Sequence, residues 1–496
     1  MELGTFLYNG WTNALAQAIA LWNPTAAARY MTNRRRFLSY KAARRNGPNR
    51  NWLGDRNSAD ATIRREWRQV VSRARDLAKN SPYVSGAIEK ICDNVVFNGI
   101  RPQFTVTRGD TLDRERARTL ERLFKRWAKA VGNTEKQELG IRHLWMDGGY
   151  FIHYFVDTDL LKKGLPPLNY ELLELDHLDR SVDGLQQNGT IARQGIEYNK
   201  RGKAVAYHLF PEHPGDNWSW VGTESRRVLA DTVEHVFTRK RISQSRGISW
   251  LASIIVGMHN FDEYQDSEQI AMRLLSAFAF FVETPFSEVE APLGGVSMNP
   301  ESGADPSEAL RSGDFVEPGQ VVTVPTGSKV HPAGYDKPGA NYEPWTKSQL
   351  RGGSAGMGVS YETFTGDLTE TTYSGGRQGL QVERRAYQRQ QGILNRKHND
   401  PVIEKWLSFV DLTGLVDLAD ADVETTHLCP GWPWVDPRND AQCARIELEM
   451  GVTTLTKLCA DRGLDFEEVV ERRVEEIKFM KERGLIEEEQ HGSQDG

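Results

Sequence analysis

The densest group of side chains able to hold a metal ion lies in ELLELDHLDR, residues 171–180. Carboxylates at such close spacing can bind two magnesium ions, which is the chemistry of a metal-dependent nuclease. We expect a strand here, and alternation along a strand puts Glu174 and Asp176 on one face and Glu171 on the other. No lysine follows in a nuclease-like spacing, and the same pattern is typical of a solvated sheet edge. The candidate ligands are Glu171, Glu174, Asp176, His177 and Asp179.

Other catalytic motifs are missing from the sequence. It contains no phosphate-binding P-loop, no Gly-x-Ser-x-Gly elbow and no His-Glu-x-x-His pair. The four cysteines show no C-x-x-C spacing, which argues against a zinc site and against a disulfide framework. We therefore expect a protein that is not an enzyme and binds no metal or cofactor.

A second stretch, residues 356–391, reads GMGVSYETFTGDLTETTYSGGRQGLQVERRAYQRQQ and changes character halfway. Its first half crowds threonine and serine together with glycine. Its second half favours a helix, in which Leu380, Tyr387 and Leu394 recur every seven residues along one narrow stripe. A mobile polar loop followed by a long helix is predicted, and an ordinary surface loop fits the same pattern.

Charge is distributed unevenly along the 496 residues, although the net charge is only -6. Residues 29–50 hold eight Lys or Arg and no acidic residue, while residues 461–496 hold twelve acidic and six basic residues. The basic block could contact nucleic acid phosphates or a neighbouring subunit. The longest apolar run, residues 274–282, is about half of the roughly 20 residues that a membrane span needs. The candidate contact residues are Arg34, Arg35, Arg36, Lys41, Arg44 and Arg45.

The hydrophobic pattern after residue 57 predicts an α+β domain, with helices first and a mainly antiparallel sheet after them. A helical hairpin begins at Ser58, breaks at Ser81-Pro82 and ends at Asn98-Gly99. Another helix covers about 111–131. Strands are expected at 103–107, 150–156, 170–175, 191–198 and 205–210, with hairpin tips at Asn188-Gly189 and Arg201-Gly202.

Two further helices, at about 260–283 and 342–357, flank a segment rich in proline and glycine. Strands at 319–325 and 328–332 within it would form a small β-containing insertion. The two helices should pack as an antiparallel pair with the insertion at its tip. Several glycines weaken the second helix, and they also allow a close helix approach.

The helix after the polar loop runs to about Asn399, and Pro401 must break or kink it before it continues to about Val410. The segment PGWPWVDP, residues 430–437, marks a boundary. Beyond it we expect three helices at 440–450, 454–462 and 466–483, and then a polar tail.

The order of these parts resembles the portal proteins of tailed bacteriophages, of the lambda-type family. One departure is the glycine pair of LRGGSAGMGV, at 352 and 353, where bulkier helix residues are expected, so the helix length is open. Four passages carry the resemblance: SRARDLAKNSPYVSGAIEKICDNVVFNGIRPQF at 72–104, VSYETFTGDLTETTYSGGRQGL at 359–380, GWPWVDPRNDAQCA at 431–444 and MGVTTLTKLCADRGLDFEEVVE at 450–471.

The resemblance implies a portal fold that forms a ring, usually of twelve subunits, at one capsid vertex. Such a ring is assembled in the host cytoplasm and becomes part of the virion. Its partners would be double-stranded DNA, bound transiently and without sequence preference, the terminase large subunit, a head-tail connector protein, the major capsid protein and scaffold. The implied parts are a basic, partly disordered arm (1–57), an α+β wing (58–259), stem helices (260–283 and 342–358), a clip (284–341), a tunnel loop (359–376), a kinked long helix with wing return (377–430), a helical crown (431–485) and a disordered tail (486–496).

The tunnel loop would then line the DNA channel. A channel for DNA of any sequence must not bind it tightly, and the loop carries carboxylates but no Lys or Arg before Arg377. The implied channel residues are Glu362, Thr363, Thr365, Asp367, Thr369, Glu370, Thr371 and Thr372, and the implied stem cations are Arg273, Lys347 and Arg351.

Two other classes of protein remain open from the sequence. One is a metal-dependent DNA-processing enzyme that uses residues 171–179, and the other is a structural ring or adaptor without a DNA-wide bore. Negative-stain images would separate them, since the enzyme predicts a compact monomer and the adaptor a ring without a bore.

Overall fold

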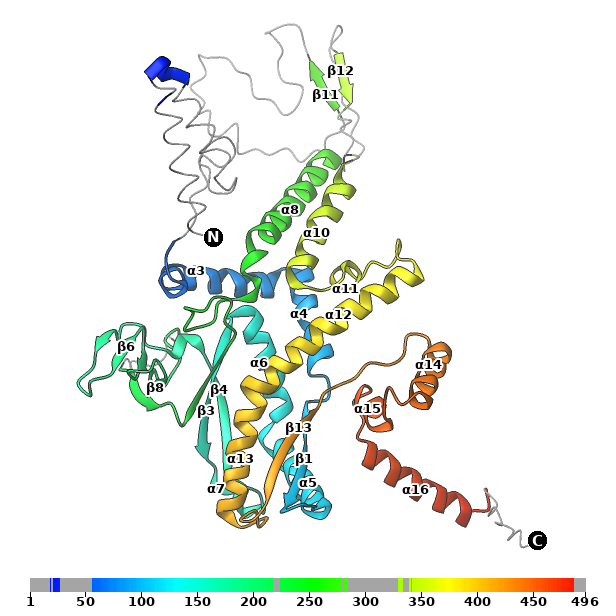
Figure 1. The fold of residues 1–496 in the computed structure, drawn as a ribbon. Coiled ribbons are helices and arrows are strands. Elements are labelled where there is room, and N and C mark those ends of the chain that lie inside the picture. The colour runs from blue at the N-terminus through cyan, green and yellow to red at the C-terminus, as the bar shows by residue number, and fades with distance from the viewer. Residues whose placement is uncertain are drawn as a thin grey trace, which may run out of the picture. The chain divides into compact units, whose positions relative to one another are not determined.

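The computed structural model describes residues 18, 21–26, 56–216, 224–277, 280–283, 329–332, 339 and 341–485. The basic block from Arg34 to Arg45, most of the expected insertion and the tail after residue 485 lie outside these ranges. The chain divides into two compact units, Met1–Ala61 and Thr62–Gly496, and the elements below belong to the second apart from the start of the first helix. Figure 1 labels them.

The predicted helical hairpin is present as α3 (Ala59–Asn80) and α4 (Pro82–Val95). Pro82 lies in the first turn of α4, where its missing N–H costs nothing. The apolar face predicted for α4 is buried, and its chain leaves through Gly99 at φ +92°. The helices α5 (Arg114–Val131) and α6 (Asn133–Met146) follow.

The described residues contain four antiparallel sheets. One is the pair of β11 (Phe280–Glu283) and β12 (Lys329–Pro332), and the other three replace the single sheet expected after the helices. The first has the order β13-β1-β2, the second β10-β3-β4, and the third is the meander β5-β6-β7-β8-β9. Their bounds are β1 Arg101–Arg108, β2 Thr111–Leu112, β3 Gly149–Val156, β4 Leu168–Glu174, β5 Gly184–Leu185, β6 Ile191–Arg193, β7 Ile196–Tyr198, β8 Ala204–Leu209, β9 Arg226–Leu229, β10 Val233–Phe237 and β13 Asp422–Leu428.

Both predicted hairpin tips are turns, between β5 and β6 and between β7 and β8. The single strand expected at 191–198 is wrong, because Gln194 and Gly195 both adopt positive φ and fold it into the β6–β7 hairpin. A side chain at position 195 would lie 2.3 Å from the carbonyl oxygen of Asp179, so this turn needs glycine.

One continuous core joins α4, α5 and α6 to the first two sheets and to a late helix, α13 (Asp400–Thr413). Trp406 of α13 inserts its ring beside Phe104 at 5.9 Å and Phe124 at 5.1 Å between centroids, and its indole is fully buried. This aromatic cluster anchors the C-terminal half of the chain to the sheets.

The helix expected at 260–283 is α8, but it spans Ile255–Ala277. It is followed by strand β11 (Phe280–Glu283), which pairs antiparallel with β12 (Lys329–Pro332). The partner predicted for 328–332, residues 319–325, lies outside the described residues. The second helix of the pair, α10, spans Tyr342–Met357 as predicted.

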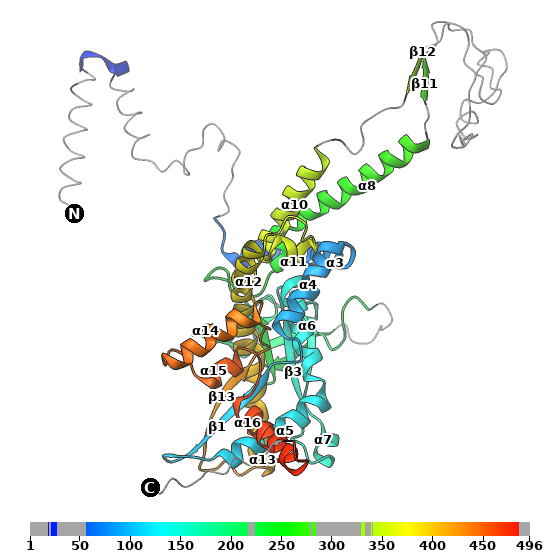
Figure 2. The ribbon, with the colours of Figure 1, turned by 90° about the vertical axis from the view of Figure 1, so that its right-hand side faces the viewer.

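α8 and α10 lie side by side in both views, and the paired strands β11 and β12 lie beyond their far ends (Figures 1 and 2). Tyr264 and Trp345 make the central contact, 4.2 Å between ring centroids. The predicted close approach holds at Gly353 and Gly356, where an added Cβ would lie 2.8 Å from Met258 Sδ and 2.1 Å from Ile254 Cγ2. Gly352 has open space around it.

The long helix is interrupted where predicted. α12 (Tyr373–Leu394) passes through a π-helical segment, η5 (Asn395–Asn399), into α13, with Pro401 in the first turn of α13. The wider π turn accommodates the proline, which cannot donate a helical hydrogen bond. Within η5, Nδ1 of the buried His398 is hydrogen-bonded to the Tyr150 hydroxyl at 2.7 Å. Burial and the nearby charge of Lys136 lower the pKa of His398 to about 3.

Three helices follow the PGWPWVDP segment, as expected: α14 (Pro437–Glu449), α15 (Leu455–Ala460) and α16 (Phe466–Glu482). None of them contains a buried residue. Among the helices of the described residues, not one combines the length and apolarity needed to span a membrane.

Candidate functional site

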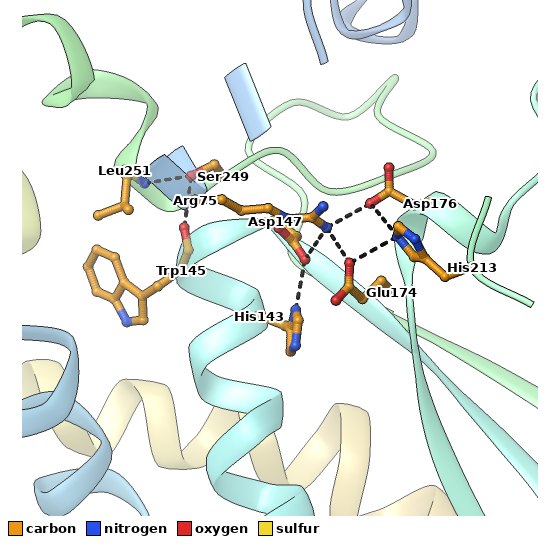
Figure 3. A network of polar contacts seen from close by, with 9 residues as sticks. All are labelled: Arg75, His143, Trp145, Asp147, Glu174, Asp176, His213, Ser249 and Leu251. Carbon is orange, nitrogen blue, oxygen red and sulfur yellow. Dashed lines mark hydrogen bonds and ion pairs between the residues drawn. The ribbon is translucent and has the colours of Figure 1, made fainter. Parts of the chain in front are cut away.

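The acidic segment is organised around an arginine from α3. Arg75 binds Asp147 through two hydrogen bonds of 2.7 and 2.9 Å, and its Nη2 also lies 2.7 Å from both Glu174 and Asp176 (Figure 3). Asp147 is fully buried and accepts a further contact from His143 at 2.7 Å. Burial alone would lower the pKa of Arg75, but Asp147 and the other carboxylates raise it above its ordinary value, so the guanidinium stays charged.

This geometry does not support the metal hypothesis. Glu174, Asp176 and His213 do place ligand atoms within 4.8 Å of one another, but Figure 3 shows both carboxylates in contact with Arg75, and His213 beside the carboxylates. A dication would have to compete with the Arg75 guanidinium, which already pairs with both carboxylates. The network therefore ties α3 to the end of β4 as a structural ion-pair cluster.

The remaining predicted ligands are dispersed. Glu171 pairs with His153 at 2.8 Å on the other face of the sheet, as alternation predicted. His177 contacts the Phe210 carbonyl, and Asp179 accepts from two serines. Asp176 is not on a strand, since residues 175–177 form a 3-10 turn, η3. Sequence reasoning missed Arg75, Asp147 and His213, because they are far away along the chain and carry no motif.

The polar stretch after α10 is more ordered than predicted. Gly358 ends α10, Ser360 caps a short helix α11 (Tyr361–Thr365), and Gly366 ends α11 with a left-handed residue. Thr372 then caps α12 by accepting from the Gly375 N–H. The expectation of one open loop from 359 to 376 is thus corrected, and the segment without regular structure is 366–372. We call residues 366–372 the tip and α11 its base.

The base is packed and hydrogen-bonded from below. Phe364 is buried and stacks on Tyr83 at 6.0 Å. The buried carboxylate of Glu383, on α12, accepts from the Ser360 N–H and from the Thr363 hydroxyl, each at 3.0 Å. The Lys90 ammonium of α4 donates to the Thr363 carbonyl. The base is therefore fixed to α4 and α12.

The predicted channel threonines all have local hydrogen-bond partners. Thr365 donates to the Tyr361 carbonyl at 2.7 Å, and its oxygen accepts from the Asp367 N–H at 3.1 Å. The other pairs are Thr363 with Glu383, Thr369 with Asp367, Thr371 with Glu362, and Thr372 with the Gly375 N–H. Their hydroxyls hold the segment in shape, a role that sequence reasoning did not assign to them.

The tip is exposed and bears an apolar residue at its centre. Leu368 is 69% exposed, and Thr369 and Glu370 beside it are exposed too. Asp367 accepts from the backbone and hydroxyl of Thr369, which turns the chain at this point.

Two of the three predicted stem cations contact this segment. Lys347 of α10 lies 2.7 Å from Glu370 and 2.8 Å from Glu343, and these two hydrogen bonds raise its pKa. Arg351 lies over the Tyr361 ring, 5.7 Å from its centroid. Arg273 is exposed on α8.

Residues 430–440 run along α12. Gln391 donates to the Pro430 carbonyl at 3.1 Å, Tyr387 stacks on Trp432, and Arg384 donates to the Pro433 carbonyl at 3.1 Å. Farther along, Arg377 pairs with Asp440 of α14 and borders a hollow of about 260 Å³. The beginning of α12, next to the tip, is thereby linked to the C-terminal helices.

The helix pair, the ordered polar segment and the interrupted long helix stand in the order that the resemblance to phage portal proteins predicts. A model of the phage portal proteins of the lambda family matches residues 45–391, and the chain belongs to this family. The resemblance seen in the four sequence passages is thus confirmed, as is the α+β fold. The nuclease alternative receives no support.

Individual relatives agree with this assignment. The chain is 26% identical over 472 residues to a probable portal protein of Halomonas phage phiHAP-1, covering 90% of this chain and 88% of that one. It is 22% identical over 505 residues to portal protein B of Escherichia phage lambda, covering 92% of each. Among solved structures, the neck of a native gene transfer agent particle computed with C12 symmetry aligns with 80% of this chain and 94% of its own at 12% identity, with a TM-score of 0.43.

Proposed function

We propose that the chain forms a ring of twelve copies at one vertex of a phage capsid and acts there as the channel for DNA packaging and ejection. The observation that carries this proposal is membership of the lambda portal family over residues 45–391. Crown helices without a single buried residue also favour assembly, because their apolar side chains need a neighbouring copy to cover them.

Within such a ring, the parts keep the roles expected from the resemblance. Residues 58–259 form the wing, α8 and α10 the stem, and residues 431–485 the crown. The clip, residues 284–341, carries the surface for the terminase large subunit and later for the connector protein. The ring is assembled in the host cytoplasm with scaffold and major capsid protein, and it has no catalytic role.

The tip is the segment that touches passing DNA. Its own residues include no cation, and a carboxylate such as that of Asp367 repels a DNA backbone. Glu370 is paired with Lys347 of α10, so its negative charge is partly compensated. The exposed Leu368 adds an apolar contact without charge. Contact of this kind is brief and independent of base sequence, as a channel requires.

The test replaces Leu368, Thr369 and Glu370 by glycine and leaves the base intact. Leu412→Gly, at a position that is 80% exposed on α13, is the control. We expect both variants to form rings with a central hole in negative stain, and only the tip variant to lose DNA packaging or retention in particles. A tip variant with ring formation, packaging and retention all unchanged would refute the tip assignment. A wild-type protein that stays monomeric in vitro and in particles would refute the portal ring itself.

A further inference from the structure

A second surface of the chain has the charge pattern of a polyanion site. On α5, Arg122, Lys125, Arg126 and Lys129 follow one another at i, i+3, i+4 and i+7, so they form one stripe. All four are exposed, and the opposite face of the helix is buried in the core through Leu120, Leu123, Phe124, Trp127 and Val131. We call the four residues the basic ridge.

The ridge is not neutralised within the chain. Arg122 donates to the Arg118 carbonyl at 3.3 Å, and Arg126 donates to the Lys163 carbonyl at 3.3 Å. Both acceptors are uncharged, so these hydrogen bonds do not compensate the charge of either guanidinium group. Among the residues that the structure describes, no carboxylate lies within ion-pair distance of any of the four. Lys163, exposed at the end of α7 (Thr158–Lys162), adds a fifth cation nearby.

Glutamates of the acidic helix α16 pair with α5 just before the basic ridge. Glu467 and Glu471 bind Arg118, one turn before the ridge, at 3.2 and 2.6 Å. Their contact ends there, and Arg122 and the residues after it stay unpaired with acid. Arg118 is thus paired with carboxylates of this chain, whereas the four ridge residues are exposed to solvent.

We propose that the basic ridge binds the phosphate backbone of duplex DNA outside the channel. Its four cations span roughly 10 Å of helix axis at about 1.5 Å per residue, and duplex DNA carries one charge per roughly 1.7 Å. Several phosphates therefore fall within reach at once. A basic stripe along an exposed helix is the usual electrostatic footprint of such binding, and guanidinium groups suit phosphates.

This surface is separate from the tip. α5 packs on β1 and α6, whereas α11 packs on α4 and α10. The ridge is therefore a surface of its own, whichever residues line the bore. Its DNA would lie against the outside of the ring and would not be the DNA in transit.

The experiment mixes preassembled full-length protein with a covalently closed circular duplex, which cannot thread a closed ring. The variant is Arg122→Glu with Arg126→Glu. The control, Arg65→Glu with Arg73→Glu, makes the same charge change at exposed positions of α3. We expect binding of the circle by wild type and control, and a loss of at least about tenfold in the ridge variant. Neutral glutamines at 122 and 126 should lower the slope of log affinity against log salt by roughly two.

Three outcomes would overturn the proposal. The first is equal binding of the circle by the ridge variant and the control. The second is loss of ring assembly in the ridge variant with DNA binding intact, which would make the ridge a contact between subunits. The third is ridge-dependent binding of polyglutamate but not of DNA. Failure of the tip variant in packaging would leave each of these results unaffected.

Discussion

The carboxylate of Glu383 is the point at which the base of the tip can be loosened without touching the tip itself. It is 3% exposed, and it accepts the Ser360 N–H and the Thr363 hydroxyl at 3.0 Å each. Ser360 in turn caps α11 through the Thr363 N–H at 3.0 Å. Glu383→Ala removes both bonds and leaves the two donors in a partly buried site.

The size of the effect follows from these contacts. A hydrogen bond to a charged group contributes about 1.5–3 kcal/mol, so loss of two bonds costs about 3 kcal/mol or more locally. A local opening that is about 3 kcal/mol easier exchanges its amide hydrogens roughly 100-fold faster. Glu383→Gln keeps one carbonyl oxygen as acceptor, and for it we expect about 1 kcal/mol, or roughly fivefold.

Hydrogen exchange of peptides covering residues 359–376 measures this directly. The control is Gln388→Ala, an exposed position of the same helix, which should leave exchange unchanged. A peptide from β3 and β4 reports on global stability. Acceleration in all peptides alike would show that Glu383 stabilises the core and not the base, and unchanged exchange at 359–376 would refute the role assigned to it.

Three further changes test the remaining geometry. Gly352→Ala should stabilise α10 by about 1 kcal/mol, because an added methyl group there meets open space. Gly356→Ala should destabilise the protein by about 1–3 kcal/mol, because its methyl group would collide with Ile254. Thermal melting measures both changes, and the opposite order of melting temperatures would contradict this packing. The buried Glu197 bonds to Arg227 and neighbours that lower its pKa from 4.5 to about 2, against the effect of burial. It should therefore contribute about 3 kcal/mol above pH 4.5 that is lost as pH falls toward 2, and Glu197→Gln should flatten that part of the urea-stability profile. Arg75→Ala leaves the buried Asp147 carboxylate without its main partner and should cost about 3–5 kcal/mol in urea unfolding, whereas a loss under 1 kcal/mol would show that His143 suffices.

Local patterns predicted the helices because their causes lie within a few residues. The hairpin of α3 and α4, the bounds of α10 and the interruption before Pro401 all follow from proline placement, glycine and apolar spacing. α8 was placed too late, although Ile255, Met258 and Phe261 already form a buried apolar stripe in its first turns. The β-branched and aromatic residues at 280–283 were wrongly included in it.

Contacts between distant residues could not be predicted in this way. Strand β13 pairs with β1 across more than 300 residues, Thr425 opposite Phe104, and alternation alone does not identify a partner. The same holds for Arg75, whose three carboxylates come from α6, β4 and η3. A cluster of acids in the sequence therefore suggested a metal site, because the cation that pairs with it lies far away.

The threonine-rich segment was predicted as mobile because composition does not distinguish free hydroxyls from capping ones. Two features of the sequence do indicate an ordered segment. Ser360 and Thr372 each precede a helical pattern, and Asp367 with Thr369 has the spacing of an Asx turn. The threonine hydroxyls that the sequence analysis assigned to DNA contact make these local hydrogen bonds instead.

The base and the tip, which together connect α10 to α12, are held in place to different degrees. The base is held by a buried phenylalanine, a buried carboxylate and a lysine from α4, and moving it would expose all three. The tip is held to this frame by Lys347 on Glu370 and by Thr371 on Glu362, and Glu370 is 66% exposed. Water competes for an ion pair at such a site, so it restrains the tip only weakly. If the tip contacts DNA as proposed, we expect a displacement of the tip to be absorbed within residues 366–372. The base α11 and the start of α12, which is joined to α14 by the Arg377–Asp440 ion pair, should then keep their positions.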